Sequence, residues 1–405
     1  MADKPGHDGK GECVYAGPMA SLPANFTLLQ VIPDLETGGA EQTTLDVAAA
    51  VVQAGGRAIV ASRGGRMVAD LQSRGAVWVP MPVHAKNPLV MWGNHGRLVE
   101  LIRRETVSLV HVRSRAPAFA AFSAARAAKV PCLATYHGVY SAGNPLKRWY
   151  NSVMTRGLVT IANSDFTREH VIAEHRIDPA RVIAIARGVD IDRFDPATVA
   201  PARVTALLDR WGIAVDDGRI RFLLAGRLSR WKGQRLLIEA ARRLKSHRDD
   251  FVVILAGDDQ GRGAYRQELE TAIAAAGLEN RVKLVGHCDD MPAAYLACDI
   301  ACAPSLDPEP FGRTAVEPQA MGRPIIAADH GAPRETVLAG ETGWLFKPRD
   351  AQALAHAMAE AIAAGPERRA AMGATGQARA RRLYSAAAMC EATLEVYAGL
   401  LGGHL

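Results

Sequence analysis

Residues 304–324 read PSLDPEPFGRTAVEPQAMGRP and place two carboxylates around the start of a predicted helix. The prolines on both sides of Glu309 exclude regular secondary structure there, because proline fixes φ and has no N–H group. The Gly-Arg-Thr turn at 312–314 and the apolar spacing after it predict a loop that enters a helix. Glu317 follows Glu309 after seven intervening residues, about two helical turns, so the pair is spaced to bracket an elongated polar ligand. The free N–H groups and the positive dipole of a first helical turn suit a phosphate.

The two glutamates, with Phe-Gly between them, resemble the signature of the family 4 glycosyltransferases, which are retaining enzymes of the GT-B fold. The resemblance implies that Glu309 contacts the donor sugar and that Glu317 holds the ribose hydroxyls of the nucleotide. In the family the backbone after the first glutamate contacts the sugar and the phosphate. The matching positions in this chain are Phe311, Gly312, Arg313 and Thr314.

Glu317 also fits a purely structural role. Thr314-Ala-Val-Glu317 matches a capping box, in which the threonine caps the helix and the glutamate reaches back to the same turn. Pro318 stands where the family usually has a small helix former, and it removes one early helical hydrogen bond. On the sequence alone, ligand contact and helix capping both remain open for Glu317.

A basic motif follows the first predicted strand of the second half of the chain. Strand 220–225 is followed by Gly-Arg227 and, five residues on, by Lys232-Gly, before a helix that runs to about residue 246. An arginine and a lysine near a helix N-terminus can converge on a diphosphate, the arginine as a fork and the lysine as a point charge. The spacing resembles the family's Gly-Arg…Lys-Gly motif, which implies that Arg227 and Lys232 bind the donor diphosphate. By itself the motif also fits a basic helix cap.

A glycine turn follows the first predicted strand, residues 26–33, and opens a helix that runs to about residue 53. Its Gly-Gly-Ala-Glu sequence resembles the first loop of the family, which implies that Gly39 approaches the donor, although glycine at such a turn is commonly structural. The next strand, 58–62, ends in Arg63 without an acidic residue for an adenosine ribose. This argues against a dinucleotide in the first half.

His137 lies just beyond the predicted strand 131–135, at the sheet edge where parallel α/β sheets bind ligands. The resemblance implies that this histidine lies beside the donor sugar and acts in catalysis with Arg227, Lys232 and Glu309. The alternative is a purely structural role, in which His137 makes a hydrogen bond that stabilises the fold. Loop 138–148, which carries Tyr140, Lys147 and Arg148, is predicted to contact the acceptor. Arg187 stands where many members of the family have asparagine.

Strands and helices alternate along the whole chain, which is typical of doubly wound parallel sheets. A chain of 405 residues exceeds one ordinary core, so two domains are expected. We predict an α/β protein of GT-B type, with two Rossmann-like domains facing each other across a cleft and a C-terminal helix that crosses back to the first domain. The predicted parts are a flexible segment 1–25, an acceptor-binding domain 26–190 joined by residues 385–405, and a nucleotide-sugar-binding domain 191–384.

Positive charge is concentrated in the first half of the chain. Residues 1–190 hold 21 Lys and Arg against 15 Asp and Glu, and residues 97–156 hold ten against two. Three explanations of this excess are open: solvated surface charge without a specific partner, binding to an anionic membrane surface, and binding to an acidic acceptor. Nucleic acid is the weakest candidate, because no helix-turn-helix, zinc-finger or aromatic-rich sheet signature accompanies the charge, and we predict no nucleic-acid partner.

No run of eighteen apolar residues occurs and the first 25 residues lack an apolar signal region, so we predict a cytoplasmic protein, peripheral on the inner face of the cytoplasmic membrane. The six cysteines form no CxxC pair and predict reduced thiols, with neither disulfide nor metal site. Asp190-Ile-Asp192 formally matches a DxD metal motif, but the prolines after it favour an interdomain linker. No metal and no cofactor are expected.

The family resemblance implies a retaining hexosyltransferase that moves a sugar from a nucleotide diphosphate sugar to a hydroxyl of a saccharide or glycolipid acceptor. Synthesis of lipopolysaccharide or another envelope polysaccharide is the predicted setting. Two other classes remain open: a GT-B-like nucleotide-sugar epimerase or phosphorylase, and a non-catalytic module that binds a membrane or a polymer. The combination of Arg227, Lys232, Glu309 and Glu317 argues against the non-catalytic module.

Overall fold

The computed structural model describes residues 22–403 except positions 37, 86, 141, 142 and 262. The chain divides into two compact units, one of residues 1–188 with 386–405 and one of residues 189–385. The predicted flexible segment 1–25 lies largely outside the described residues.

The first unit is built on seven parallel strands in the order β3-β2-β1-β4-β5-β6-β7. Leu29 of β1 lies in register between Ile59 of β2 and Val110 of β4. The strand order reverses at β1 and β4, and open α/β sheets bind ligands beyond the carboxyl ends of the strands at such a reversal. The strands are β1 (Thr27–Val31), β2 (Arg57–Ser62), β3 (Val77–Pro80), β4 (Leu109–Val112), β5 (Cys132–Tyr136), β6 (Thr160–Ala162) and β7 (Val182–Ala184).

Helices cover both faces of this sheet, as the almost wholly apolar strands require. One face packs against α3 (Pro88–Arg104), α4 (Arg115–Ala128) and α6 (Asp165–His175). The other face packs against α1 (Gly39–Gln53), α2 (Val68–Ser73) and α15 (Ala386–Gly402). The short helix α5 (Pro145–Asn151) continues into a 3-10 turn over Ser152–Thr155.

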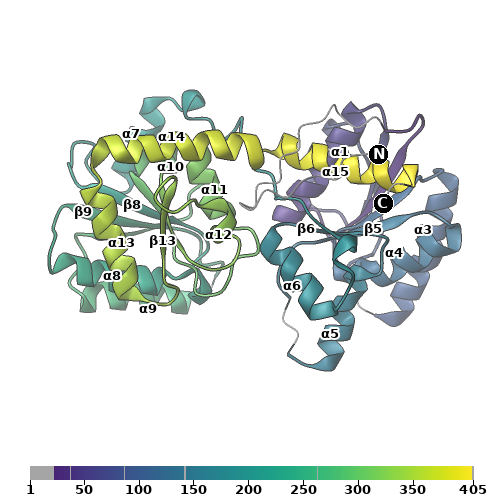
Figure 1. Cartoon of the computed structure of the whole chain (residues 1–405), viewed down its shortest axis with the longest axis horizontal. Coiled ribbons are helices and arrows are strands. Elements are labelled where there is room, and N and C mark those ends of the chain that lie inside the picture. The colour runs from purple at the N-terminus through teal and green to yellow at the C-terminus, as the bar shows by residue number, and fades with distance from the viewer. Residues whose placement is uncertain (1–21, 37, 86, 141–142, 262, 404–405) are drawn as a thin grey trace. The chain divides into compact units, whose positions relative to one another are not determined.

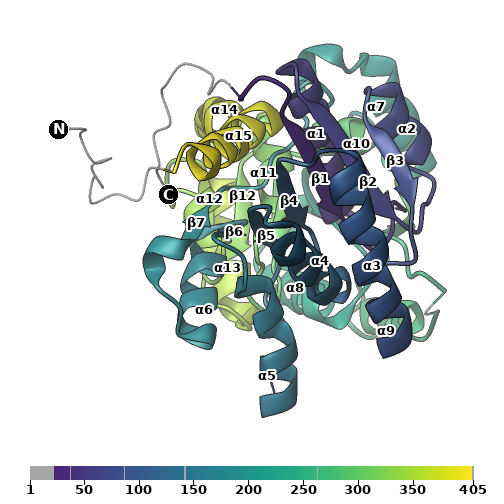
Figure 2. The same ribbon diagram turned by 90° about the vertical axis from the view of Figure 1, so that its right-hand side faces the viewer.

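The last helix, α15, belongs to the first unit although it follows the second unit in sequence. Its Tyr397 is fully buried, with its ring centroid 6.1 Å from that of Phe26 and its hydroxyl 2.6 Å from His111 Nδ1. Figures 1 and 2 show α15 in yellow beside α1. The C-terminal helix thus returns to the first unit, as expected for the predicted fold class.

The second unit is built on six parallel strands in the order β10-β9-β8-β11-β12-β13. Phe222 of β8 lies in register between Val253 of β9 and Ile300 of β11. This strand order reverses at β8 and β11, in the same way as the first sheet reverses at β1 and β4. The strands are β8 (Ile220–Ala225), β9 (Phe251–Ala256), β10 (Val282–Gly286), β11 (Ile300–Ala303), β12 (Ile325–Ala328) and β13 (Gly343–Phe346).

The largest core of the second unit lies between its sheet and α8 (Gln234–Lys245), α9 (Gly263–Ala275) and α13 (Ala351–Ala363). The other face carries α11 (Arg313–Ala320), against which α14 (Gly365–Leu383) packs (Figure 1). Helix α10 (Met291–Ala297) packs on α7 (Pro201–Arg210), and α12 (Pro333–Thr336) is a single turn.

The predicted α/β class with doubly wound parallel sheets is confirmed. The alternating pattern of the sequence also predicts a helix near 94–105. This helix, α3, begins earlier, at Pro88, because the Asn87 side chain caps it by accepting from Leu89 N–H at 2.9 Å and proline is well tolerated at the first helical position. Helix α7 is not predicted. Its first residue is Pro201, which favours a linker in the sequence but again occupies a first helical position.

Candidate active site

The two motifs of the second unit lie in the loops that follow β8 and β11, the neighbouring strands at which the sheet order reverses. Loop 226–233 carries the Arg227 and Lys232 motif, and loop 304–312 carries Glu309. Loops at the carboxyl ends of two such strands line the ligand position of open α/β sheets. The fold therefore brings together residues that are 77 positions apart in the chain.

Lys232 and Glu309 form an ion pair at the centre of this region. Lys232 Nζ lies 2.5 Å from Glu309 Oε1, and the Ser305 hydroxyl donates to the same oxygen at 2.5 Å. Only 13% of the lysine side chain and 7% of the glutamate side chain are exposed, so solvent screens the pair weakly. The ammonium has three donors, so it retains hydrogens for a ligand. The structure thus pairs two residues for which the resemblance implies separate ligand contacts.

Two glycines allow the loops around this ion pair to approach each other. Gly233 has a φ of 80°, and a Cβ at that position would overlap the carbonyl oxygen of Pro304. Gly331 has a φ of 64°, and a Cβ there would lie 2.7 Å from the backbone nitrogen of Glu309. A side chain at either glycine would push the Glu309 loop out of its place.

Arg227 lies at the surface beside this ion pair. Its carbonyl oxygen accepts from Gln234 Nε2 at 2.9 Å, and its guanidinium donates to Gln260 Oε1 at 3.4 Å. The preceding residue, Gly226, lies against the stem of Lys232, because a Cβ there would be 3.8 Å from Lys232 Cδ. Arg227 and Lys232 therefore arise from one turn, and the exposed guanidinium is free to turn toward an anionic ligand.

Helix α11 begins with a glycine and not with a capping side chain. Gly312 is the N-cap, with φ 79° and ψ 62°, and no side chain caps the helix. Thr314 is the second helical residue, so the capping-box interpretation of Thr314 and Glu317, which needs Thr314 at the N-cap, is wrong. Within the described part of the chain, the backbone N–H groups of Arg313 and Thr314 have no acceptor and suit an anion. The Phe311 side chain is buried edge-on to Tyr384, which leaves only the Phe311 backbone for a ligand.

Glu317 is 8% exposed and is held by two side chains. Its Oε2 accepts from the Tyr295 hydroxyl at 3.0 Å, and its Oε1 lies 2.8 Å from Arg313 Nη2. Burial, and then the charge of Glu317, raise the pKa of Tyr295, so the phenol keeps its proton and donates it. Helix α11 continues through Pro318. A carboxylate has about four acceptor positions, so Glu317 retains capacity for two ribose hydroxyls.

In the first unit, His137 follows β5 and contacts Arg187. Arg187 Nη2 lies 3.0 Å from His137 Nδ1, so Nδ1 accepts and the ring proton is assigned to Nε2. Burial holds the pKa of His137 well below its ordinary range, and the charges of Arg187 and Arg113 lower it further, so the imidazole is neutral. Its Nε2 is buried, has no partner among the described residues, and belongs to a histidine that lines a small cavity. The predicted catalytic histidine is therefore a neutral N–H donor.

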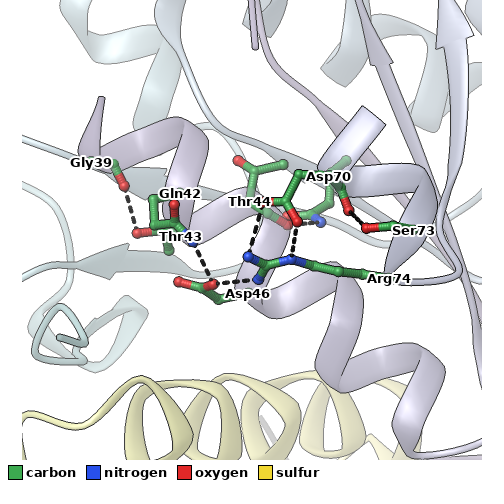
Figure 3. Close-up of polar contacts among 9 residues, drawn as sticks. Gly39, Gln42, Thr43, Thr44, Asp46, Asp70, Ser73 and Arg74 are labelled. Atoms are coloured by element: carbon green, nitrogen blue, oxygen red, sulfur yellow. Dashed lines mark hydrogen bonds and ion pairs between the residues drawn. The ribbon is translucent and has the colours of Figure 1, made fainter. Parts of the chain in front are cut away.

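Gly39 is the first residue of α1, and it lies against Arg187. A Cβ at Gly39 would be 2.5 Å from Arg187 Nη1, so glycine is needed at this position for the arginine to occupy its place. The carbonyl oxygen of Gly39 accepts from the Thr43 hydroxyl at 2.7 Å (Figure 3). The resemblance implies that Gly39 contacts the donor, and the structure places the Arg187 guanidinium beside this glycine.

Two buried polar residues near His137 have no counterpart among the predicted site residues. His111 lies in β4, with its ring nitrogens 2.6 Å from the Tyr397 hydroxyl and 2.7 Å from Thr135 Oγ1. Arg113 follows the same strand and is 2% exposed. In the sequence, both residues can be recognised by their position at the carboxyl end of an apolar strand. Polar residues at such a position lie at the ligand-binding edge of a parallel sheet.

The predicted acceptor loop is only partly described, since residues 141 and 142 lie outside the described range. Tyr140 packs on Tyr136 with ring centroids 4.5 Å apart, and Arg115 Cζ lies 3.8 Å from the Tyr140 ring centroid. Arg148 pairs with Glu174 at 2.7 Å. Asp190 of the DxD sequence accepts from the Arg193 N–H at 3.0 Å, which is a turn-capping contact.

The cysteines at positions 132, 288, 298, 302 and 390 are free thiols, and Cys13 lies outside the described residues. Burial raises the pKa of Cys298 and of Cys390 to about 12, so both thiols keep their protons. Over the residues that the structure describes, no three His, Cys, Asp or Glu side chains gather into a possible metal site.

Comparison with known proteins follows the division into two units. The family described as Glycosyltransferase Family 4 matches residues 37–193, and the family described as Glycosyl transferases group 1 matches residues 208–379. The crystal structure of a glycosyltransferase from Rickettsia africae ESF-5 is 32% identical in sequence, has a TM-score of 0.86, and aligns over 94% of this chain and 99% of that chain. This chain belongs to the family 4 glycosyltransferases. The predicted GT-B fold is confirmed.

Two further proteins are also similar to the chain. The structure of Anabaena HepE in complex with UDP-glucose is 25% identical, with a TM-score of 0.78, over 93% of this chain and 100% of that chain. A D-inositol 3-phosphate glycosyltransferase of Mycobacterium sp. (strain JLS) is 32% identical over 209 residues, which are 51% of this chain and 45% of that protein. The match thus spans about half the length of this curated relative.

Proposed function

We propose that this family 4 glycosyltransferase transfers a sugar, with retention of anomeric configuration, from a nucleotide diphosphate sugar to a hydroxyl group of a saccharide or glycolipid acceptor. The observation that carries the proposal is the Lys232–Glu309 pair, 2.5 Å apart at the strand reversal of the second unit. A cation for the diphosphate and a carboxylate for sugar hydroxyls are held together there before any ligand binds. The UDP-glucose complex of Anabaena HepE makes UDP-sugars the first donors to test.

The second unit supplies groups for each part of the donor. Lys232 and the exposed Arg227 are positioned for the diphosphate, together with the N–H groups of Arg313 and Thr314 at the start of α11. Glu309 is positioned for the sugar, and Glu317 for the ribose. Both carboxylates are buried, so their side chains are held in one orientation and have little contact with solvent.

The slow part of the reaction is the build-up of negative charge on the departing diphosphate as its bond to the anomeric carbon breaks. Preorganised donors aimed at that charge give the largest share of catalysis in such reactions. In the front-face substitution that the family resemblance implies, the acceptor oxygen bonds to the anomeric carbon on the face that the diphosphate leaves. The acceptor proton passes to the released phosphate oxygen. His137, neutral and with a free N–H, would donate to a sugar oxygen, and no metal takes part.

The biosynthetic process that we propose for this enzyme is the synthesis of lipopolysaccharide or another envelope polysaccharide or glycolipid, at the cytoplasmic face of the membrane. Its support is the basic excess of residues 97–156, together with the exposed apolar side chains of Leu146 and Trp149 in that range and of Leu158 just after it. In the described part of the chain, no helix combines the length and the apolar character that crossing a bilayer demands. Binding to anionic lipid headgroups would bring the enzyme to a glycolipid acceptor.

The test is turnover of the purified chain with the nucleotide sugar selected by a thermal-shift screen of UDP, GDP, ADP and CMP. Arg227→Ala and Lys232→Ala should each reduce turnover at saturating donor by about 10²–10³-fold, or roughly 2–4 kcal/mol, as expected for loss of one preorganised donor. Lys245→Ala, an exposed lysine at the end of α8, is the matched control and should keep its activity. Turnover in EDTA should equal turnover with added Mn²⁺.

Thermal unfolding separates catalysis from folding in these variants. Lys232→Ala leaves Glu309 buried without its cation and should lower the unfolding temperature, whereas Arg227→Ala removes a surface side chain and should not. Wild-type turnover in the Arg227 and Lys232 variants would reject the diphosphate assignment. Donor consumption without an acceptor, or with orthophosphate alone, would favour the epimerase or phosphorylase class.

A further inference from the structure

A second group of charged and polar residues lies at the carboxyl ends of the strands of the first unit, separate from the proposed donor-binding groups of the second unit. Arg113 follows β4, His137 follows β5 and Arg187 follows β7. All three line one small cavity, to which Thr43 and Asn163 also contribute. The first sheet therefore has its own concentration of positive charge at its ligand-binding edge.

Arg113 is a buried cation with neutral partners. Its Nε and Nη2 donate to Gln30 Oε1 at 2.7 and 2.5 Å, and its Nη1 donates to Thr135 Oγ1 at 3.2 Å. Among the described residues, these guanidinium contacts go to an amide oxygen and a hydroxyl oxygen, and none goes to a carboxylate. A guanidinium stays charged in proteins even where burial lowers its pKa, as it does here. Burying a charge without a counter-ion is costly, so the site favours an anion from outside the chain.

The acidic residue of the chain whose charge acts on Arg113 is Asp46 of α1, and it is already engaged by other side chains. The Asp46 carboxylate accepts from Gln42 Nε2 at 2.8 Å and from Arg74 Nη1 at 3.0 Å (Figure 3). Arg74 pairs with Asp70 as well, at 2.9 Å. Asp46 therefore belongs to an ion-pair network between α1 and α2, and it leaves the charge of Arg113 largely uncompensated.

Arg187 and His137 add to the positive potential of the cavity. The contact from Arg187 to His137 Nδ1 orients the imidazole, and His137 Nε2 is left buried without a partner. The place of Arg187 depends on Gly39, because any side chain there would collide with the guanidinium. An anionic oxygen in the cavity would receive charge-assisted hydrogen bonds from guanidinium groups and one from the imidazole N–H.

The size of the cavity limits what can enter it. Its volume is about 20 Å³, which is room for a single water-sized atom. One oxygen of a carboxylate or phosphate fits, while the remainder of the ligand stays outside. The site is therefore suited to an anionic substituent of a larger substrate and not to a whole sugar.

We propose that Arg113, Arg187 and His137 form a specificity site for a carboxylate or phosphate group on the sugar substrate. This inference rests on the proposed glycosyl transfer, because that reaction brings a sugar to this edge of the sheet. The anionic group has two possible sources: an acidic acceptor, such as a sugar acid or sugar phosphate, or a uronate in the donor. The recognised chemistry, an anionic oxygen beside His137, is the same for both.

The acceptor arm of the test compares glucuronate and glucose 6-phosphate with glucose, without nucleotide, by ligand-observed NMR and thermal shift. The wild-type chain should bind one of the charged sugars at least about tenfold more tightly than glucose, the preference expected of hydrogen bonds between charged groups. Arg113→Gln should abolish the preference and Arg187→Asn should weaken it. Arg126→Gln, an exposed arginine on α4, is the matched control and should retain it.

The donor arm compares UDP-glucuronate with UDP-glucose in the same variants. A preference that is seen only here, and that Arg113→Gln abolishes, assigns the anionic group to the donor sugar. Equal affinity for charged and neutral partners in both arms overturns the proposal. A preference abolished by Lys232→Ala but kept in Arg113→Gln also overturns it, because the anion then binds at the diphosphate site.

Two further measurements keep the outcomes distinct. Thermal unfolding without ligand should show that Arg113→Gln is folded and at least as stable as the wild type, because the substitution removes an uncompensated buried charge. Failure of the proposed glycosyl transfer would appear as absence of nucleotide-sugar binding while the preference for charged sugars persists. Failure of the anion site would appear as nucleotide-sugar binding with no such preference.

Discussion

Glu309 and Glu317 are held in the same way, because each carboxylate is oriented by one cation and one hydroxyl. Glu309 is paired with Lys232 and accepts from Ser305, and Glu317 is paired with Arg313 and accepts from the Tyr295 phenol. Charge-assisted hydrogen bonds of this kind fix geometry as well as charge. The chain's own groups therefore orient both carboxylates, so a donor that binds as proposed would spend little of its binding energy on ordering them.

At the residue scale, Glu317→Gln should weaken donor binding by roughly 1.5–3 kcal/mol, because the amide loses an ionised acceptor for the ribose hydroxyls while keeping the shape of the side chain. Tyr295→Phe is the matched variant, since it removes the internal contact and keeps the carboxylate. It should lower the free energy of unfolding by about 1–2 kcal/mol and leave donor affinity close to that of the wild type. Calorimetric binding and thermal unfolding of both variants test this. Unchanged nucleotide affinity in Glu317→Gln would show that the residue serves only Tyr295 and Arg313.

At the scale of secondary-structure elements, glycines determine how closely the loops of the second unit approach. Gly233 ends the turn before α8 in a left-handed conformation and lies against the Pro304 carbonyl. Gly257, which follows β9, lies in the same way against the carbonyl oxygen of Gly226. These contacts set the distance between the loops after β8, β9 and β11, and therefore the distance from Lys232 to Glu309.

Gly233→Ala and Gly212→Ala separate backbone strain from steric collision. Both glycines have positive φ, 80° and 64°, but a Cβ at Gly212 meets nothing within 4 Å. Gly212→Ala should cost about 1 kcal/mol of stability through strain alone. Gly233→Ala should cost about 1–3 kcal/mol more, because the added methyl overpacks the loop contact, and it should also lower turnover. Chemical denaturation curves measure both free energies. Equal destabilisation by the two substitutions would mean that the Pro304 contact does not position the loop.

At the scale of the whole molecule, basic and exposed apolar residues occur together in the segment 146–158. Leu146 and Trp149 of α5 are 73% and 55% exposed, and Leu158 is 53% exposed. Lys147 and Arg156 are exposed in the same segment, and Arg156 Cζ lies 5.7 Å from the Trp149 ring centroid. Apolar side chains among cations suit the interface of an anionic membrane.

The full chain should therefore sediment with vesicles of phosphatidylcholine mixed with phosphatidylglycerol, and not with phosphatidylcholine alone. Added salt should release it, because the attraction is electrostatic. Leu146→Ser and Trp149→Ala should each weaken binding by about 1–2 kcal/mol through loss of apolar contact. Val215→Ser, an equally exposed apolar residue of the second unit, is the control and should bind as the wild type does. Equal binding to neutral and anionic vesicles would contradict an electrostatic membrane contact.

Local signals in the sequence predict much of the fold. Apolar runs of strand length and the glycine or proline turns after them are properties of a few consecutive residues, so β8 falls where it is predicted, over 220–225. Proline is a weaker guide, because its meaning changes with position. Proline disrupts the interior of a helix but is favourable at the first helical position. For this reason the sequence does not predict α7, which begins at Pro201, and predicts α3, which begins at Pro88, too short.

The sequence by itself determined which residues of the second unit are candidates for the site, because Arg227, Lys232, Glu309 and Glu317 stand in motifs of fixed spacing. Tertiary structure alone decided what these residues touch. The Lys232–Glu309 pair spans 77 positions, and the cluster of Arg113, His137 and Arg187 joins the ends of three strands. Both depend on strand order, which is set by long-range packing of whole sheets and is not encoded in any short stretch. The contact between Tyr397 and His111 spans 286 positions and forms only because the C-terminal helix returns to the first unit.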